Sequence, residues 1–363
     1  MSKNIFSKAK SQEKQNKTKD EEIKQLTNKT KIELKMKKFK KIMLIFLGLI
    51  AVLGVSGYVY FNQQFPKQIA VEEIKIEVTP ARLERGKYIF NHAAGCVDCH
   101  STRDFSKLSG PIKPGTEGMG GEKFDEEFGL PGTFYSKNIT PYGVGNWTDG
   151  ELVRAITEGI SKDGSVLFPI MPYLVYGKMD REDIYSVIAY IRTLPSIKND
   201  VPKSEPNFPM SMIMKTIPTE KQFTQKPDKK DIIAYGEYMV KGASCGDCHT
   251  PSNEGAPIPG KEFAGGIEIK MPGNTVVRTA NLTPDNETGL GLWTKEQFIK
   301  RFKHCSDPAY GNTPYKPGDF QTIMPWTIYA GLTEEDLGAI YEYLRTIPAV
   351  KNQVEKFSVR QQY

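Results

Sequence analysis

The residues best suited to chemistry are two cysteine pairs, each followed at once by a histidine. They read Cys96-Val97-Asp98-Cys99-His100 and Cys245-Gly246-Asp247-Cys248-His249. Two thiols one helical turn apart can form thioether bonds with the vinyl groups of one porphyrin, and the adjacent imidazole can then coordinate its iron. The spacing therefore predicts two covalent haem c groups, attached through Cys96, Cys99, Cys245 and Cys248, with His100 and His249 as axial ligands.

Three other uses of paired cysteines fit the pattern less well. A four-cysteine zinc site would have to unite pairs about 150 residues apart and would leave both histidines unexplained. A thioredoxin-like redox pair needs a strand-to-helix setting that neither pair has. A disulfide within Cys-x-x-Cys is strained. These readings stay as alternatives to haem attachment.

An electron carrier needs a second axial ligand on each iron, and two methionines are placed to supply it. Met171 follows Cys96 by 75 positions and Met324 follows Cys245 by 79, and each stands between an isoleucine and a proline. Thioether sulfur favours ferrous iron, and a following proline stiffens the turn that presents it. We predict Met171 and Met324 as axial ligands. Because both faces of each iron would then be occupied, no catalytic residue is predicted.

The chain has two further histidines and one further cysteine. The position that matches His92 in the second half of the chain is not a histidine, so His92 is not expected to be a required ligand. His304 and Cys305 are interpreted as a hydrogen-bonded histidine and an inert, half-buried thiol. A ligand swap to either residue is the alternative, since an exposed free thiol would oxidise outside the cytoplasm.

The same unit occurs twice in the chain. Matched segments in the same order are Gly86-x-Tyr88 with Gly236-x-Tyr238, the two Cys-x-x-Cys-His motifs, Asn138-Ile139-Thr140-Pro141 with Asn281-Leu282-Thr283-Pro284, Trp147-Thr148 with Trp293-Thr294, Ile170-Met171-Pro172 with Ile323-Met324-Pro325, and Tyr190–Pro195 with Tyr343–Pro348. A period near 150 residues is too long for a solenoid. We interpret it as a duplicated domain and call residues 83–197 copy one and residues 231–352 copy two.

Each copy carries matching helix signals. Thr148-x-x-Glu151 and Thr294-x-x-Gln297 are capping boxes. A last helix is predicted after Asp180 and after Thr333, with apolar side chains at helical spacing. The long stretches 101–146 and 250–292 are rich in Gly, Pro and Asn and are predicted to be loops organised by a bound group. The fold class predicted is mainly α, with two tandem cytochrome c domains after an N-terminal transmembrane helix.

A membrane anchor is predicted near the N-terminus. Residues 42–61 carry no charge and are long enough to cross a bilayer, with lysines before them and aromatic residues at their end. Residues 1–41 are predicted to be a disordered or loosely helical cytoplasmic tail. We expect a single pass through a bacterial inner membrane, with the haem domains periplasmic or extracytoplasmic. A cleaved signal peptide and a buried core helix are the alternatives.

Charge is distributed unevenly along the chain. The first 41 residues carry a net charge of +9, from 14 lysines against five acids, while the remainder carries −3. The folded part therefore has no basic character that would support nucleic-acid binding. The remaining boundaries predicted are linkers over 62–82 and 198–230 and a C-terminal tail over 353–363.

On these motifs the chain resembles the cytochrome c subunits of membrane-bound alcohol and gluconate dehydrogenases. The resemblance extends over about residues 83–350 and implies a cytochrome c fold for each copy, with Met171 and Met324 as axial ligands. It also implies that Gly86 and Gly236 let their helices cross closely under Tyr190 and Tyr343. Those subunits usually look tri-haem, with a signal peptide and a C-terminal membrane contact. This chain has two motifs and an N-terminal apolar segment.

The leading functional prediction is single-electron transfer to and from redox partner proteins. Electrons would pass from a quinol-linked complex or an extracytoplasmic dehydrogenase to an oxidase or a soluble cytochrome. The alternative is a di-haem enzyme of the peroxidase or thiosulfate dehydrogenase type, whose chemistry needs an open or unusual axial site. A structural or sensory membrane protein ranks last, because it would make no use of two haem motifs.

Overall fold

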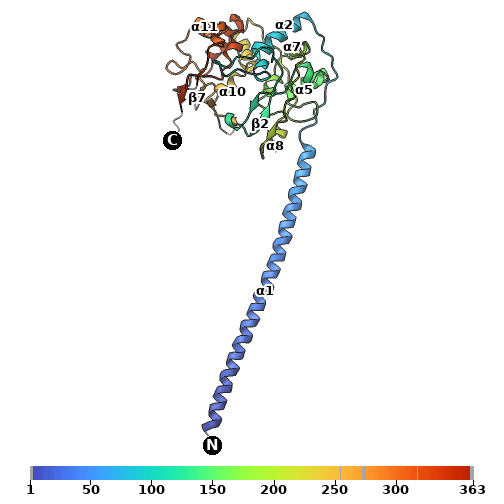
Figure 1. Cartoon of the computed structure of the whole chain (residues 1–363), viewed down its shortest axis with the longest axis vertical. Helices are drawn as coiled ribbons and strands as arrows, with labels where there is room; N and C mark the ends of the chain where they lie inside the picture. Colours follow the sequence, from blue (N-terminus) through green and yellow to red (C-terminus); the bar gives the residue numbers. More distant parts are fainter. Residues whose placement is uncertain (1–2, 254, 272–274, 317, 360–363) are drawn as a thin grey trace. The chain divides into compact units, whose positions relative to one another are not determined.

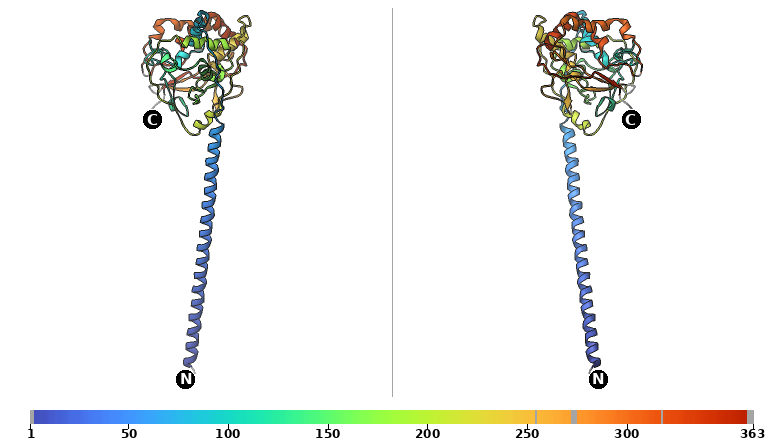
Figure 2. Two further views of the ribbon diagram at one scale, coloured as in Figure 1. Left: turned by 90° about the vertical axis from the view of Figure 1, so that its right-hand side faces the viewer. Right: turned by 90° about the vertical axis from the view of Figure 1, so that its left-hand side faces the viewer.

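The computed structural model describes residues 3–253, 255–271, 275–316 and 318–359. Met1–Phe65 and Pro66–Tyr363 form two separate compact units. The first unit contains helix α1 (Lys3–Gln64), which runs without a break in Figure 1 and in both views of Figure 2. The helix therefore extends through the predicted anchor and back through most of the lysine-rich tail.

In the described residues, one helix is long and apolar enough to cross a membrane, and it is the Asn16–Gln64 part of α1. The predicted anchor at 42–61 lies inside it, and its apolar side chains are exposed, with Leu53 at 71%. Length and composition are the basis for this assignment, and a signal sequence meets the same criteria. The membrane-spanning role of 42–61 therefore stays a prediction.

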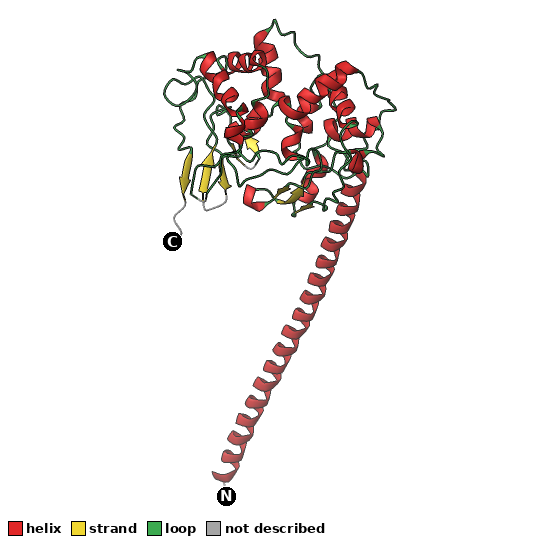
Figure 3. Ribbon diagram, turned by 45° about the horizontal axis from the view of Figure 1, so that its top comes forward, coloured by secondary structure: helices red, strands yellow, loops and turns green. Residues whose placement is uncertain are grey.

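The second unit is mainly helical, as predicted, with short strands between long loops (Figure 3). In copy one and just before it, the helices are α2 (Pro80–Tyr88), η1 (Ile89–Ala93), α3 (Cys96–Cys99), η2 (Glu126–Phe128), α4 (Pro141–Val144), α5 (Asp149–Glu158), α6 (Tyr173–Tyr176) and α7 (Arg181–Ile191). After copy one come α8 (Met210–Ile213) and η3 (Met214–Thr216). In copy two they are α9 (Ile232–Gly242), α10 (Cys245–His249), α11 (Lys295–Lys303), η4 (His304–Ser306), α12 (Pro308–Gly311), α13 (Trp326–Tyr329) and α14 (Glu334–Leu344).

The predicted helix starts are confirmed. The capping boxes of Thr148 and Thr294 both form, so α5 and α11 begin directly after them. Asp180 accepts hydrogen bonds from the first turn of α7, and Thr333 does the same for α14. The apolar residues at helical spacing in α7 are buried, and those in α14 are buried except for the half-buried Tyr341.

Two close helix crossings organise the core. α2 packs on α7, and α9 packs on α14. A Cβ atom on Gly86 would lie 1.9 Å from the carbonyl oxygen of Ser186, and one on Gly236 would lie 2.0 Å from that of Ala339. Tyr190 and Tyr343 lie directly over these glycines, at 2.9 Å from the same positions. The close approach implied by the family resemblance is therefore present in both copies.

The loops predicted at 101–146 and 250–292 are loops in the main, but they also contain short antiparallel strands. In the part of the chain that the structure describes, the sheets join β1 (Lys123–Phe124), β2 (Gly132–Tyr135) and β3 (Glu205–Pro206); β4 (Ser252–Asn253) and β5 (Ala256–Pro257); and β6 (Glu268–Met271), β7 (Thr275–Arg278) and β8 (Phe357–Val359). Strands of two to four residues are too short for their alternation to stand out among Gly, Pro and Asn. The predicted C-terminal tail supplies β8.

The two copies are joined by exchanged tyrosines. Tyr88 of copy one donates its hydroxyl hydrogen to Asp336 of copy two and accepts from the backbone N–H of Thr333 at 3.1 Å. Tyr238 of copy two donates to Asp183 of copy one at 2.7 Å and accepts from the backbone of Asp180 at 3.3 Å. Each tyrosine thus ties its own first helix to the start of the last helix in the other copy.

The segment predicted as a linker, 198–230, lies along copy one. The Gln222 N–H donates to the Gly177 carbonyl at 2.7 Å, and Lys221 forms ion pairs with Glu72 at 2.7 Å and with Glu158 at 3.2 Å. Met214 is buried. The segment is therefore part of the compact second unit, which extends over both copies.

Candidate functional site

Each cysteine pair lies on one short helix, with His100 directly after α3 and His249 as the last residue of α10. α3 and α10 both begin after a residue in the left-handed conformation, Gly95 with φ of 60° and Ser244 with φ of 51°. None of the described cysteines is in a disulfide. Nor do the described Cys, His, Asp and Glu side chains gather into a group of three or more that could hold a bare metal ion. The paired thiols are thus free for another use.

Burial sets the protonation state of these thiols. It raises the pKa of Cys96 and Cys245 to about 12, so these two thiols are protonated at neutral pH. A catalytic redox pair needs the opposite shift, because the thiolate is the nucleophile. The cysteine environment does not fit the thioredoxin-like alternative.

Both motif histidines are oriented in the same way. Nδ1 of His100 donates to the Lys137 carbonyl at 2.7 Å, and Nδ1 of His249 donates to the Ala280 carbonyl at 2.7 Å. A carbonyl oxygen can only accept, so the proton lies on Nδ1 and the Nε2 lone pair is left for a metal. Burial lowers the pKa of both imidazoles, which keeps them neutral. The residues present therefore fit a haem iron at each motif.

Two matching loops present these carbonyls. In copy one the Asn138 side chain accepts from the backbone and hydroxyl of Thr140 and donates to the carbonyls of Ile197 and Asn199. In copy two Asn281 accepts from Thr283 in the same two ways and donates to the Val350 carbonyl and the Thr288 hydroxyl. The repeated Asn-x-Thr-Pro sequence thus fixes the backbone one residue after each carbonyl acceptor.

Sequence reasoning missed two glycines that support these loops. The N–H of Gly120 donates to the His100 carbonyl at 2.8 Å, and the N–H of Gly265 donates to the His249 carbonyl at 2.7 Å. Both have positive φ, and a Cβ atom on either would lie 2.4 Å from the carbonyl oxygen that orients the histidine. The signal was a Gly-Gly pair that begins 20 residues after His100 and 16 residues after His249.

The methionine turns also match in their local backbone. The N–H of Tyr173 donates to the Met171 carbonyl at 2.7 Å, and the N–H of Trp326 donates to the Met324 carbonyl at 2.8 Å. Both methionine side chains are partly buried.

A tyrosine five residues after each methionine reaches back to the segment before the motif. Tyr176 donates its hydroxyl hydrogen to the Ala94 carbonyl at 3.4 Å, and Tyr329 donates to the Ala243 carbonyl at 2.7 Å. These two tyrosines bring each predicted methionine loop to its cysteine helix. Sequence reasoning did not single them out, although their spacing from Met171 and Met324 is identical.

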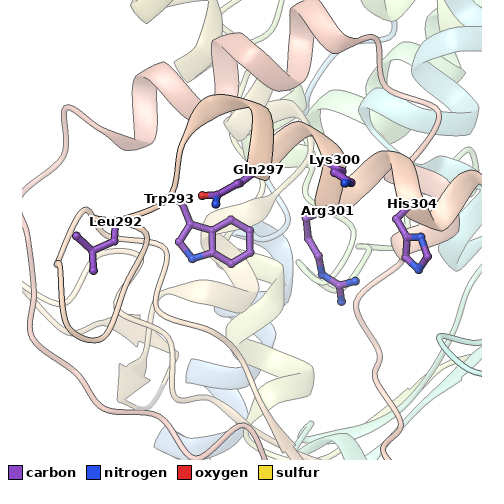
Figure 4. Close-up of a pocket in the computed structure, with 6 residues that line it drawn as sticks. All are labelled: Leu292, Trp293, Gln297, Lys300, Arg301 and His304. Carbon is purple, nitrogen blue, oxygen red and sulfur yellow. The ribbon is translucent and has the colours of Figure 1, made fainter.

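The remaining histidines and the fifth cysteine have other surroundings. Nδ1 of His92 lies 2.9 Å from the Ile328 carbonyl, and burial lowers the pKa of this imidazole. Cys305 is buried, and its thiol donates to the Arg301 carbonyl at 3.5 Å. His304 lines a surface pocket of about 540 Å³ along α11 (Figure 4). The lining of this pocket is Leu292, Trp293, Gln297, Lys300, Arg301 and His304, none of which is a predicted ligand.

Comparison with known proteins supports the prediction from motifs. The chain is 30% identical over 288 residues to the cytochrome c subunit of a quinone-linked alcohol dehydrogenase from Komagataeibacter europaeus, a match that covers 74% of this chain and 57% of the subunit. It is 28% identical over 298 residues to the gluconate 2-dehydrogenase cytochrome c subunit of Pantoea cypripedii, which covers 75% of this chain and 61% of that subunit. No protein-family model matches the chain.

A third relative is closer to this chain in length. It is a dihaem c-type cytochrome from Cereibacter sphaeroides, 27% identical over 277 residues, which covers 74% of this chain and 86% of that protein. The dehydrogenase subunits are longer, and the chain spans little more than half of their length. Haem c is the cofactor that all these cytochromes imply. By sequence, the chain is a homologue of the cytochrome c subunits of alcohol, gluconate and fructose dehydrogenases and of a dihaem cytochrome c.

Proposed function

We propose that the chain carries two haem c groups, one in each of two tandem cytochrome c domains at 83–197 and 231–352. The first would be bonded to Cys96 and Cys99, with His100 and Met171 as axial ligands. The second would be bonded to Cys245 and Cys248, with His249 and Met324. The observation that carries the proposal is the repeated geometry of His100 and His249, each with Nδ1 on a backbone carbonyl at 2.7 Å.

Several contacts of the chain's own residues support such a site. The carbonyls of Lys137 and Ala280 hold the imidazole rings in one tautomer and one orientation. The hydrogen bonds of Tyr176 and Tyr329 draw the methionine turns toward the cysteine helices. When bound, haem c supplies a one-electron ferric/ferrous couple, and a methionine ligand raises its reduction potential.

Electron transfer is the function that this ligand set favours. An imidazole and a thioether on each iron leave no position for a substrate. Relatives of the chain are named as cytochrome subunits of dehydrogenases. We therefore propose that it takes electrons from an extracytoplasmic dehydrogenase or a quinol-linked complex and passes them to an oxidase or a soluble cytochrome. The apolar segment 42–61 would anchor it by a single pass, with the N-terminus cytoplasmic and the haem domains periplasmic or extracytoplasmic.

Spectroscopy of the purified full chain tests the ligand set. We expect low-spin iron in both oxidation states and a near-infrared charge-transfer band of methionine-ligated ferric haem. Because each haem would contribute to this band, its intensity should fall by about half in Met171→Ala and also in Met324→Ala. A high-spin, five-coordinate haem in the unmodified protein, with turnover of peroxide or thiosulfate, would replace this proposal with the di-haem enzyme.

A further inference from the structure

A loop of copy one hydrogen-bonds to the turn that carries Met324 in copy two. The Ser109 hydroxyl donates to the Met324 carbonyl at 2.6 Å and accepts from the Trp326 N–H at 3.3 Å. It thereby brackets Pro325, the residue between them. Ser109 is 1% exposed, so water does not compete for these hydrogen bonds.

Gln321, a residue of copy two, hydrogen-bonds to the same loop of copy one. Its side-chain oxygen accepts from the N–H groups of Ser109 at 2.8 Å and Thr322 at 2.9 Å. Its amide nitrogen donates to the carbonyls of Phe105 at 3.3 Å and Lys107 at 2.9 Å. Gln321 is fully buried. Three of its hydrogen bonds go to the backbone of the Ser109 loop, and the fourth comes from the backbone of Thr322, two residues before Met324.

Arg103 extends the contact to the first cysteine motif. Its guanidinium donates to the carbonyl of Ile323 at 3.1 Å and to that of Ser109 at 2.7 Å. The same side chain, 5% exposed, forms an ion pair at 3.3 Å with Asp98, which lies between Cys96 and Cys99. One buried arginine therefore contacts the first motif of copy one and the residue before Met324.

The conformation of Ser109 indicates that its hydroxyl is needed. Its φ is +64°, a left-handed conformation that favours glycine and costs other residues about 1 kcal/mol or more. A glycine would avoid that cost but would have no hydroxyl for the Met324 turn. Ser109 thus adopts a costly backbone conformation at the position where its hydroxyl makes two hydrogen bonds to the Met324 turn.

The turn of Met171 is held differently. Its backbone hydrogen-bonds within copy one, with the N–H of Met171 donating to the Phe168 carbonyl at 3.1 Å and the Met171 carbonyl accepting from the N–H of Tyr173 at 2.7 Å. Within the described residues, no side chain of copy two hydrogen-bonds to the backbone of Met171. Side chains of copy one therefore bond to the backbone of the Met324 turn, and the Met171 turn has no matching contact from copy two among the described residues.

We propose that Arg103, Ser109 and Gln321 form a clamp that positions Met324 as the axial ligand of the second haem, so that copy one sets the ligation and potential of copy two. The inference rests on the proposed function. These three are positioning residues, which act through the Met324 backbone. Loosening the clamp is expected to weaken the methionine bond and lower the potential of that haem alone, since methionine ligation raises it.

The test compares Ser109→Ala and Ser109→Gly with a matched control, Ser106→Ala, in the full-length, haem-loaded protein. Ser106 is an exposed serine of the same loop, and its hydroxyl donates to the Asp104 carboxylate. A redox titration resolves two one-electron components, and the near-infrared methionine band is measured alongside. Met171→Ala and Met324→Ala assign the components to the two copies.

We expect both Ser109 variants to lower the potential of the copy-two component and to weaken its share of the methionine band, with the copy-one component and Ser106→Ala unchanged. Both variants lose the hydroxyl, but only Ser109→Gly relieves the left-handed φ, so denaturant unfolding of the two variants separates a loss of positioning from a loss of stability. Unchanged copy-two values in both Ser109 variants would overturn the clamp. A parent protein without any methionine band would instead refute the proposed ligand set.

Discussion

The histidine loops and the methionine turns of the two copies have diverged to different degrees. His100 and His249 share the same carbonyl distance, the same Asn-x-Thr support and the same crowded glycine. The Met171 turn is closed within copy one, whereas the Met324 turn also receives Ser109 and Arg103 from the other copy. The histidine supports therefore match between the two copies, whereas the methionine supports differ.

The strongest way to break the similarity between the copies is to fill their helix crossings. We expect Gly86→Ala and Gly236→Ala each to cost more than about 3 kcal/mol, because the new methyl group would meet backbone oxygens about 2 Å away. Denaturant unfolding of the full chain measures the loss. Gly311→Ala is the control, since its Cβ would meet only Thr327 at 3.6 Å. Tolerance of either core substitution would contradict the packing described.

The two aspartates that accept hydrogen bonds from Tyr238 and Tyr88 should differ in how much their substitution destabilises the protein. Asp183 accepts from Tyr238 and is paired with Arg85 at 2.6 Å and Lys226 at 2.9 Å. We expect Asp183→Asn to cost about 3 kcal/mol, because the partly buried Arg85 guanidinium loses the charge of its buried partner. Asp336→Asn should cost less, since its cation, Lys229, is 3.5 Å away and half exposed. Equal losses in unfolding experiments would refute the asymmetry.

The same carboxylate predicts a pH dependence. Burial acts to raise the pKa of Asp183, but its hydrogen bond and charge interaction with Arg85, aided by Lys226, hold that pKa below its usual value. A pKa lowered by folding stabilises the protein above the ordinary aspartate range and loses that contribution as the pH falls through the folded value. Stability of the parent should therefore fall below about pH 4. The decline should be smaller in Asp183→Asn.

The Asn-x-Thr loops provide the test of likeness between the copies. Asn138→Ala and Asn281→Ala each remove a buried side chain with four hydrogen bonds, and we expect each to cost about 2 kcal/mol. The haem potential of the affected copy should shift as well, because the carbonyl that orients its histidine is loosened. Asn207→Ala, at an exposed position, is the control. A shift in one copy only would break the similarity.

The smallest expected effect is a difference in stability between the Phe variants of Tyr329 and Tyr176. Tyr329→Phe should cost about 1 kcal/mol, because it removes a 2.7 Å hydrogen bond to the Ala243 carbonyl. Tyr176→Phe should cost less, since its bond to the Ala94 carbonyl is 3.4 Å long. Thermal unfolding of the two variants side by side measures the difference. The reverse order would show that these distances do not rank the two contacts.

Local signals in the sequence predicted much of the fold. The caps at Thr148, Asp180, Thr294 and Thr333 start their helices as expected, because a cap and its first turn are neighbours along the chain. The motif histidines and cysteines were identified from five-residue motifs. The short strands were missed, since two to four residues hold too little alternation to detect.

What could not be predicted depends on contacts between distant parts of the chain. Tyr88 meets Asp336, and Ser109 meets Gln321, across more than 200 residues, and no periodicity marks either pair. Ser109 is also an ordinary serine in sequence, and no local pattern marks its left-handed φ of 64°. The repeat predicted two similar sites, and only the packing between copies revealed how their supports differ.

Intact mass measures directly whether one haem is attached to each cysteine motif. The unmodified chain should carry the added mass of two haem groups, and Cys96→Ser with Cys99→Ser should carry one, as should Cys245→Ser with Cys248→Ser. A chain purified from cells competent in haem attachment without any added porphyrin mass would contradict the account, as would a double variant that kept both groups.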